Sequence, residues 1–72
     1  HPIDEKDNIT EERLVILYAM IKQLNVIEKG LILLFLEGKS YEEIAMITGF
    51  SSSNVGTRLS RIKKKLLRMI IH

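Results

Sequence analysis

The feature that most constrains this chain is a set of helix start and stop signals between Ser40 and Ser51. Ser40 is followed three residues later by Glu43, the capping-box pattern that begins a helix. Gly49 predicts the end of that helix, because glycine readily takes the left-handed conformation of a C-cap. Ser51 predicts the N-cap of the next helix, and Phe50 is expected to plug into the core at the turn. Two helices joined by so tight a turn predict a helix-turn-helix.

The helix after Ser51 divides into a narrow apolar stripe and a polar remainder. At roughly 100° per residue, five apolar side chains fall within about 40° of one direction: Val55, Leu59, Ile62, Leu66 and Met69. The opposite side carries Ser53, Thr57, Ser60 and Lys64, and one flank carries Asn54, Arg61, Lys65 and Arg68. Short hydroxyl side chains allow close approach to another surface, and the cations suit a polyanion. The alternative is that this face is only exposed to solvent, because any amphipathic helix has a polar outer side.

Charge is distributed unevenly along the chain. The net charge is only +2, but all nine acidic residues lie at or before Glu43. With five basic residues in that part, its net charge is −4, whereas the part from Ile44 onward has six basic residues, no acid and a net charge of +6. This asymmetry predicts a polyanion at the C-terminal helix and repulsion or protein contact elsewhere.

Two helices are expected before Ser40. Thr10 looks like the N-cap of the first, with Glu11 and Glu12 in a turn where the helix dipole favours acids, after a flexible arm at residues 1–9. Its apolar face is expected at Leu14, Leu17, Tyr18, Ile21 and Leu24. Val15, Ile16 and Met20 lie off that face and are either core residues or surface that meets another domain.

The second helix is expected over about Val26–Glu37, with Asn25 as its N-cap and Gly38 closing it. The run Leu31–Leu36 makes this helix apolar nearly all round. We therefore expect it to be the central, most buried helix. The alternative is that part of this apolar surplus forms a docking groove for a partner.

These patterns predict an all-α fold of four helices with short connections, a helix-turn-helix domain without a wing over residues 10–71. A hydrophobic content of 46% suffices for a small packed bundle. The longest apolar run, Leu31–Leu36, is far too short to span a membrane, and a reducing cytoplasm fits the absence of cysteine.

The sequence offers no catalytic or metal-binding constellation. Glu42 and Glu43 are adjacent, so on a helix they point about 100° apart and cannot act as an acid–base pair. The only histidines are terminal, His1 and His72, and no glycine-rich phosphate loop is present. We therefore expect neither enzyme activity nor a cofactor or metal ion.

Four segments together resemble region 4 of bacterial RNA polymerase sigma factors, above all those of the extracytoplasmic-function group. They are residues 21–24, 34–45, 49–51 and 54–66. The most specific part is Ser-Tyr-Glu-Glu-Ile-Ala at residues 40–45, paired with the Val-x-x-Arg-Leu-x-Arg spacing that starts at Val55. The family usually has Leu-Pro where this chain has Leu24 and Asn25. An asparagine N-cap can start the helix in place of the proline. Nothing in the chain resembles region 2, so we expect that it does not initiate transcription alone.

The resemblance implies that the helix after Ser51 enters the major groove of the minus-thirty-five promoter element. Bases or nearby phosphates would be contacted by Ser53, Asn54, Gly56, Thr57, Ser60 and Arg61. The phosphates of the DNA backbone would be contacted by Arg58, Lys64 and Lys65. They would also be contacted by the first turn of the preceding helix, at Lys39, Ser40 and Tyr41. The resemblance also implies docking on the flap of the polymerase β subunit, and often capture by an anti-sigma factor.

Two of these contact positions have a second interpretation. Gly56 lowers helix propensity by about 1 kcal/mol relative to alanine, and close packing explains a glycine there as well as approach to DNA does. Arg58 borders the apolar stripe and could anchor the turn instead of contacting phosphate.

Two other functions remain open from the sequence. LuxR-type transcriptional regulators share the glycine, Glu-Ile-Ala and valine framework, but they usually have a histidine where Arg58 stands, and they dimerise on paired half-sites. The chain could also be a helical protein-interaction module that does not bind DNA.

Overall fold

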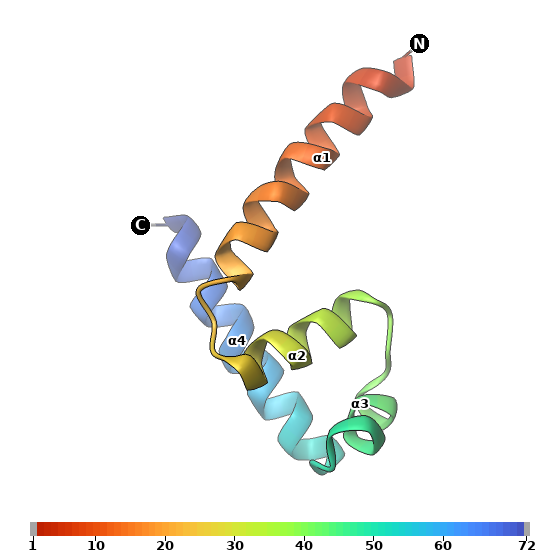
Figure 1. The fold of residues 1–72 in the computed structure, drawn as a ribbon, viewed down its shortest axis with the longest axis vertical. Coiled ribbons are helices and arrows are strands. Elements are labelled where there is room, and N and C mark those ends of the chain that lie inside the picture. The colour runs from red at the N-terminus through yellow and green to blue at the C-terminus, as the bar shows by residue number, and fades with distance from the viewer. Residues whose placement is uncertain (1, 72) are drawn as a thin grey trace.

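The computed structural model describes the backbone of residues 2–71 and the side chains of residues 11–70. Within this part there are four α-helices and no strand: α1 (Pro2–Ile21), α2 (Val26–Leu36), α3 (Tyr41–Thr48) and α4 (Ser52–Ile71). Helices α2 and α3 pack on α4. Only the C-terminal end of α1 meets α4, and the N-terminal part of α1 points away from the other helices (Figure 1). The predicted all-α, four-helix fold is confirmed. No helix of the described part is long and apolar enough to cross a membrane.

Helices α2 and α3 both begin with a reciprocal capping box. At the start of α2, the Glu28 amide donates to Asn25 Oδ1 (2.8 Å) and the Asn25 amide donates to Glu28 Oε1 (3.0 Å). At the start of α3, the Glu43 amide donates to Ser40 Oγ (3.1 Å) and the Ser40 amide to Glu43 Oε1 (2.9 Å). Both predicted N-caps are confirmed, and the participation of Glu28 is an addition.

The turn between α3 and α4 has the predicted geometry. Gly49 takes the left-handed conformation, with φ of 85°, and its amide donates to the Ala45 carbonyl (2.8 Å). Ser51 Oγ accepts a hydrogen bond from the Asn54 amide (3.1 Å), so Ser51 caps α4. Phe50 is partly buried and packs against the core, as expected.

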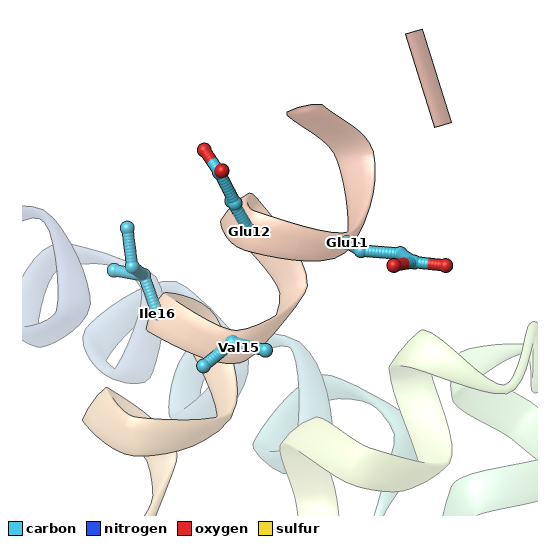
Figure 2. Close-up of a pocket in the computed structure, with 4 residues that line it drawn as sticks. All are labelled: Glu11, Glu12, Val15 and Ile16. Carbon is cyan, nitrogen blue, oxygen red and sulfur yellow. The ribbon is translucent and has the colours of Figure 1, made fainter. Parts of the chain in front are cut away.

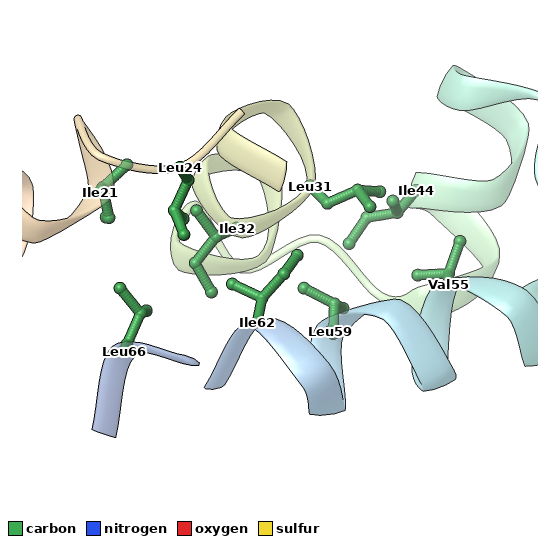
Figure 3. Close-up of a cluster of buried hydrophobic side chains, with 9 residues drawn as sticks. All are labelled: Ile21, Leu24, Leu31, Ile32, Ile44, Val55, Leu59, Ile62 and Leu66. Carbon is green, nitrogen blue, oxygen red and sulfur yellow. The ribbon is translucent and has the colours of Figure 1, made fainter. Parts of the chain in front are cut away.

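Helix α4 supplies the largest share of the core. Nine buried apolar side chains form one cluster, drawn in Figure 3: Ile21, Leu24, Leu31, Ile32, Ile44, Val55, Leu59, Ile62 and Leu66. Four of the nine belong to the predicted α4 stripe, and its fifth member, Met69, packs against the cluster. The expectation that α2 is the central, most buried helix holds for one side of the helix only. Because α3 and α4 cover only one side of α2, Leu31 and Ile32 are buried, but Val26, Ile27, Leu33 and Leu36 remain exposed.

Helix α1 begins earlier in the chain than predicted. It begins at Pro2, so Thr10 lies inside the helix and is not its N-cap. The flexibility of residues 1–9 stays a prediction, and His1 and His72 lie outside the described residues.

The apolar face of α1 is only partly used. Ile21 is buried, and Leu17 and Met20 pack against the core, whereas Leu14 and Tyr18 are exposed. The prediction that Leu14 and Tyr18 face the core was therefore wrong. The reason is geometric: α1 diverges from α4, so only its last turns reach the other helices (Figure 1).

Candidate nucleic-acid interface

The polar side of α4 faces away from the buried cluster. The buried α4 side chains point toward the other helices (Figure 3). The residues opposite them are exposed, as are two arginines on one flank: Ser53, Thr57, Ser60 and Lys64 opposite, and Arg61 and Arg68 on the flank. The Thr57 hydroxyl donates to the Ser53 carbonyl (3.0 Å), so it lies close to its own helix. The chain has no acidic residue after Glu43. This face therefore combines small hydroxyl side chains with positive charge.

Two cations on the flanks of α4 are held by aromatic rings of the protein. The Arg58 guanidinium lies 4.4 Å from the centroid of the Phe50 ring, and Arg58 Nε donates to Asn54 Oδ1 (3.0 Å). Lys63 Nζ lies 4.2 Å from the centroid of the Phe35 ring. The Arg58 contacts connect α4 to the turn and support the interpretation that Arg58 anchors the turn.

A third cation, Lys65, is paired with an acidic residue of α2. Lys65 Nζ lies 3.0 Å from Glu28 Oε2 and 3.2 Å from Glu28 Oε1, the one ion pair between described side chains. The hydrogen bond from the Asn25 amide, and then the one from Lys65, hold the pKa of Glu28 below its ordinary value. A DNA phosphate would have to compete with Glu28 for Lys65.

Gly56 lies where α4 crosses the start of α3. A Cβ atom at this position would come within 3.2 Å of Tyr41 Cε2, a tight contact. The Tyr41 ring also lies 6.4 Å from the Phe35 ring, measured between centroids. The absence of a side chain at Gly56 therefore lets Tyr41 pack on α4, which supports the close-packing interpretation. Whether Gly56 also meets DNA stays a prediction.

The remaining predicted contacts lie at the start of α3. Lys39 is partly buried, whereas Ser40 and Tyr41 are exposed. The Ser40 hydroxyl oxygen already accepts the Glu43 amide, but a serine hydroxyl retains its own hydrogen as a donor. The hydrogen bond from the Ser40 amide, and then the one from its hydroxyl, lower the pKa of Glu43. An anion at the start of α3 would therefore have to compete with the Glu43 carboxylate for the Ser40 hydroxyl hydrogen.

An apolar groove lies beside this polar face. It has a volume of about 260 Å³ and is lined by α2, the end of α3 and the turn, with Val26, Ile27, Leu34 and Phe50 among its walls. A smaller hollow of about 150 Å³ separates Glu28 from Arg58 and Arg61. Among the described residues, no cluster of His, Cys, Asp or Glu could hold a metal ion.

The sequence was also compared with known proteins. A family model described as Sigma-70, region 4 matches residues 14–66, well over half of the chain. The matched part runs from the middle of α1 through the helix-turn-helix to the last buried residue of α4. No curated protein and no solved structure matches the chain.

The Glu28–Lys65 pair generates a prediction about stability and pH. Because the folded-state pKa of Glu28 is lowered, its contribution is present above pH 4.5, the ordinary glutamate pKa, and is lost as pH falls through the folded-state pKa. We expect Glu28→Gln to lower the free energy of unfolding by about 0.2–1 kcal/mol near neutral pH. A glutamine can still accept the Asn25 amide in the capping box, so the loss reports the carboxylate charge, through its hydrogen bond with the Asn25 amide and its ion pair with Lys65.

Urea denaturation of both proteins at a series of pH values measures this difference. The difference should shrink toward zero as the solution is acidified below pH 4.5. Glu42→Gln is the matched control, because the exposed Glu42 carboxylate makes no hydrogen bond to another described residue. A difference between wild type and Glu28→Gln that is independent of pH would contradict this assignment.

Proposed function

Because the chain belongs to the sigma-70 region 4 family, we propose that it recognises the minus-thirty-five element of bacterial promoters through α4. The observation that supports this proposal best is the outward face of α4, which is cationic, free of acid and built on small hydroxyl side chains. In this role the chain would work with RNA polymerase in the bacterial cytoplasm and contribute to transcription initiation. The family match favours this function over that of a LuxR-type regulator.

The N-terminal half of α4 would meet base edges in the major groove. Helices that enter the groove read bases mainly with residues near their N-terminus. Ser53, Thr57 and Ser60 would permit close approach, with Asn54 at the flank. Arg61 is the best candidate for reading a base, because its guanidinium can donate two hydrogen bonds to guanine.

Phosphates would be contacted on both sides of the groove. Further along α4, Lys64 and Arg68 are exposed, and Lys65 could exchange Glu28 for a phosphate. On the other side, the start of α3 would offer Lys39, the Ser40 hydroxyl and the Tyr41 hydroxyl. Arg58 would hold the turn in place by stacking on Phe50. A phosphate contact by Arg58 would either be made in addition to this stacking or replace it.

Replacing Arg61 tests whether it reads a base. On a duplex selected from a random pool for tight binding, Arg61→Ala should reduce the binding free energy by about 1–3 kcal/mol, and by much less on a scrambled duplex. Lys65→Ala removes the same charge one turn later and should weaken binding to both duplexes similarly. Fluorescence anisotropy on the two duplexes measures both variants. Equal losses on the two duplexes for Arg61→Ala would show that this arginine contacts phosphate only.

The apolar groove between α2 and the turn would receive the flap of the polymerase β subunit. The Leu31–Leu36 run led us to expect an apolar surface there, but Leu31 and Ile32 are buried. The groove instead opens at the N-terminal end of α2, where Val26 and Ile27 are 83% and 52% exposed. An anti-sigma factor that captures this chain would have to cover this groove or the outward face of α4, and would compete with flap peptide or duplex.

We expect a peptide from the β-subunit flap to retain the wild-type chain in a pull-down and a scrambled peptide not to. Ile27→Asp should abolish retention, because a carboxylate in the groove wall would lose its hydration when the peptide binds. Met46→Asp is the control, since Met46 is 87% exposed on α3 and does not line the groove. Retention that survives Ile27→Asp would place the flap contact elsewhere.

A further inference from the structure

Two side chains in the N-terminal part of α4, Asn54 and Arg58, are joined by a hydrogen bond. Arg58 Nε donates to Asn54 Oδ1 (3.0 Å), one helical turn earlier. The backbone amide of Asn54 donates to Ser51 Oγ (3.1 Å), so the cap of α4 also holds the Asn54 backbone. Asn54 is exposed, and no hydrogen bond joins its Nδ2 group to another described residue. The Nδ2 group is therefore available to a partner outside the chain.

Arg58 is itself held in one orientation. Its guanidinium lies 4.4 Å from the centroid of the Phe50 ring, and Phe50 is partly buried against the core. The Phe50 amide donates to Thr48 Oγ1 (3.3 Å), which ties the turn that carries the ring to the end of α3. Because the guanidinium is planar and stacks on a ring, its Nε–H group points in a fixed direction. The same contact therefore fixes the side chain of Asn54.

The chemistry of the two groups determines which atom of the Asn54 amide faces Arg58. An asparagine amide has an oxygen that accepts and a nitrogen that donates, whereas a guanidinium only donates. The oxygen must therefore face Arg58, and Nδ2, at the other corner of the planar amide, is directed away from it. An asparagine pairs with adenine by using both atoms, the oxygen on N6 and the nitrogen on N7. In Asn54 the oxygen is already engaged by Arg58.

We propose, on the basis of the DNA-binding role proposed for α4, that Arg58 is a positioning residue that makes Asn54 a hydrogen-bond donor to DNA. The group that Asn54 meets is then an acceptor: guanine O6 or N7, thymine O4, or a phosphate oxygen. It is not the edge of adenine. Arg58 acts through Asn54 and needs no DNA contact of its own.

A double-mutant cycle of Arg58→Met and Asn54→Ala tests this coupling. Methionine keeps an unbranched side chain that can lie on the Phe50 ring, but it has neither an N–H donor nor a charge. Fluorescence anisotropy gives the affinity of the wild type, both single variants and the double variant. The loss of the Arg58 charge weakens binding with or without Asn54, so it cancels in the cycle. We expect Arg58→Met to reduce affinity for the selected duplex at least about threefold more with Asn54 present than in the Asn54→Ala background.

The same cycle on the scrambled duplex identifies the source of the acceptor. Coupling on the selected duplex alone supports the proposal with a base as the partner of Asn54, and coupling on both duplexes supports it with a phosphate. Additive losses on both duplexes would overturn it. If the wild type still prefers the selected duplex, additive losses refute only the role of Arg58. If the wild type shows no salt-dependent binding to either duplex, the proposed function fails as well.

Arg13→Met is the matched control, because it makes the same substitution on α1. Arg13 is exposed and lies between Glu12 and Val15, which Figure 2 shows projecting from α1. This part of α1 lies far from the turn between α3 and α4 (Figure 1). Arg13→Met should therefore show no coupling with Asn54→Ala, and equal coupling for Arg13 and Arg58 would overturn the proposal.

Hydrogen exchange at Arg58 tests the contact without changing Arg58. Nuclear magnetic resonance of the free chain measures how fast the Arg58 Nε proton exchanges with water. Because a hydrogen-bonded proton exchanges only after the bond opens, exchange should be at least about threefold slower in the wild type than in Asn54→Ala. Asn54→Ala should remain helical in far-UV circular dichroism, since alanine has the highest helix propensity. Equal exchange rates in the two proteins would show that Arg58 does not hold Asn54 and would overturn the proposal.

Discussion

Burial of one stripe of α4 against the other three helices is the interaction on which the rest of the structure depends. Val55, Leu59 and Ile62 are almost completely inaccessible to solvent, and Ile44 of α3 packs among them. Because an α-helix has a fixed periodicity, burying this stripe also determines which residues face outward. The hydroxyl and cationic side chains of α4 are therefore presented to solvent by the same packing that holds the small domain together.

The protein divides the cations of α4 into two sets. Arg58 and Lys63 stack on phenylalanine rings and Lys65 pairs with Glu28, so these three help to hold α4 against the turn and α2. Arg61, Lys64 and Arg68 are exposed, and no hydrogen bond joins their side chains to other described residues. A polyanion would thus be attracted mainly by the three cations that make no such contact, and not by all six basic residues of α4.

Sequence patterns predicted the helix caps and the turn well, because the interactions that form them join residues only a few positions apart. The caps at Ser40 and Ser51 and the left-handed Gly49 each depend on neighbours within one turn. Properties that depend on how helices are placed were mispredicted or missed. The divergence of α1 exposes Tyr18, and the pair between Glu28 and Lys65 joins residues 37 positions apart. The fit of Tyr41 against Gly56 likewise depends on where α3 crosses α4.

The salt dependence of DNA binding tests most directly whether the outward face of α4 binds a nucleic acid. Each neutralised phosphate releases counterions, so the affinity falls with salt in proportion to the number of contacts. Three to five phosphate contacts by α4 and the start of α3 predict a slope of about −3 to −5 in a plot of log affinity against log salt concentration. Fluorescence anisotropy with a labelled duplex measures this slope. A slope near zero would contradict the assignment of this face as a DNA-binding surface.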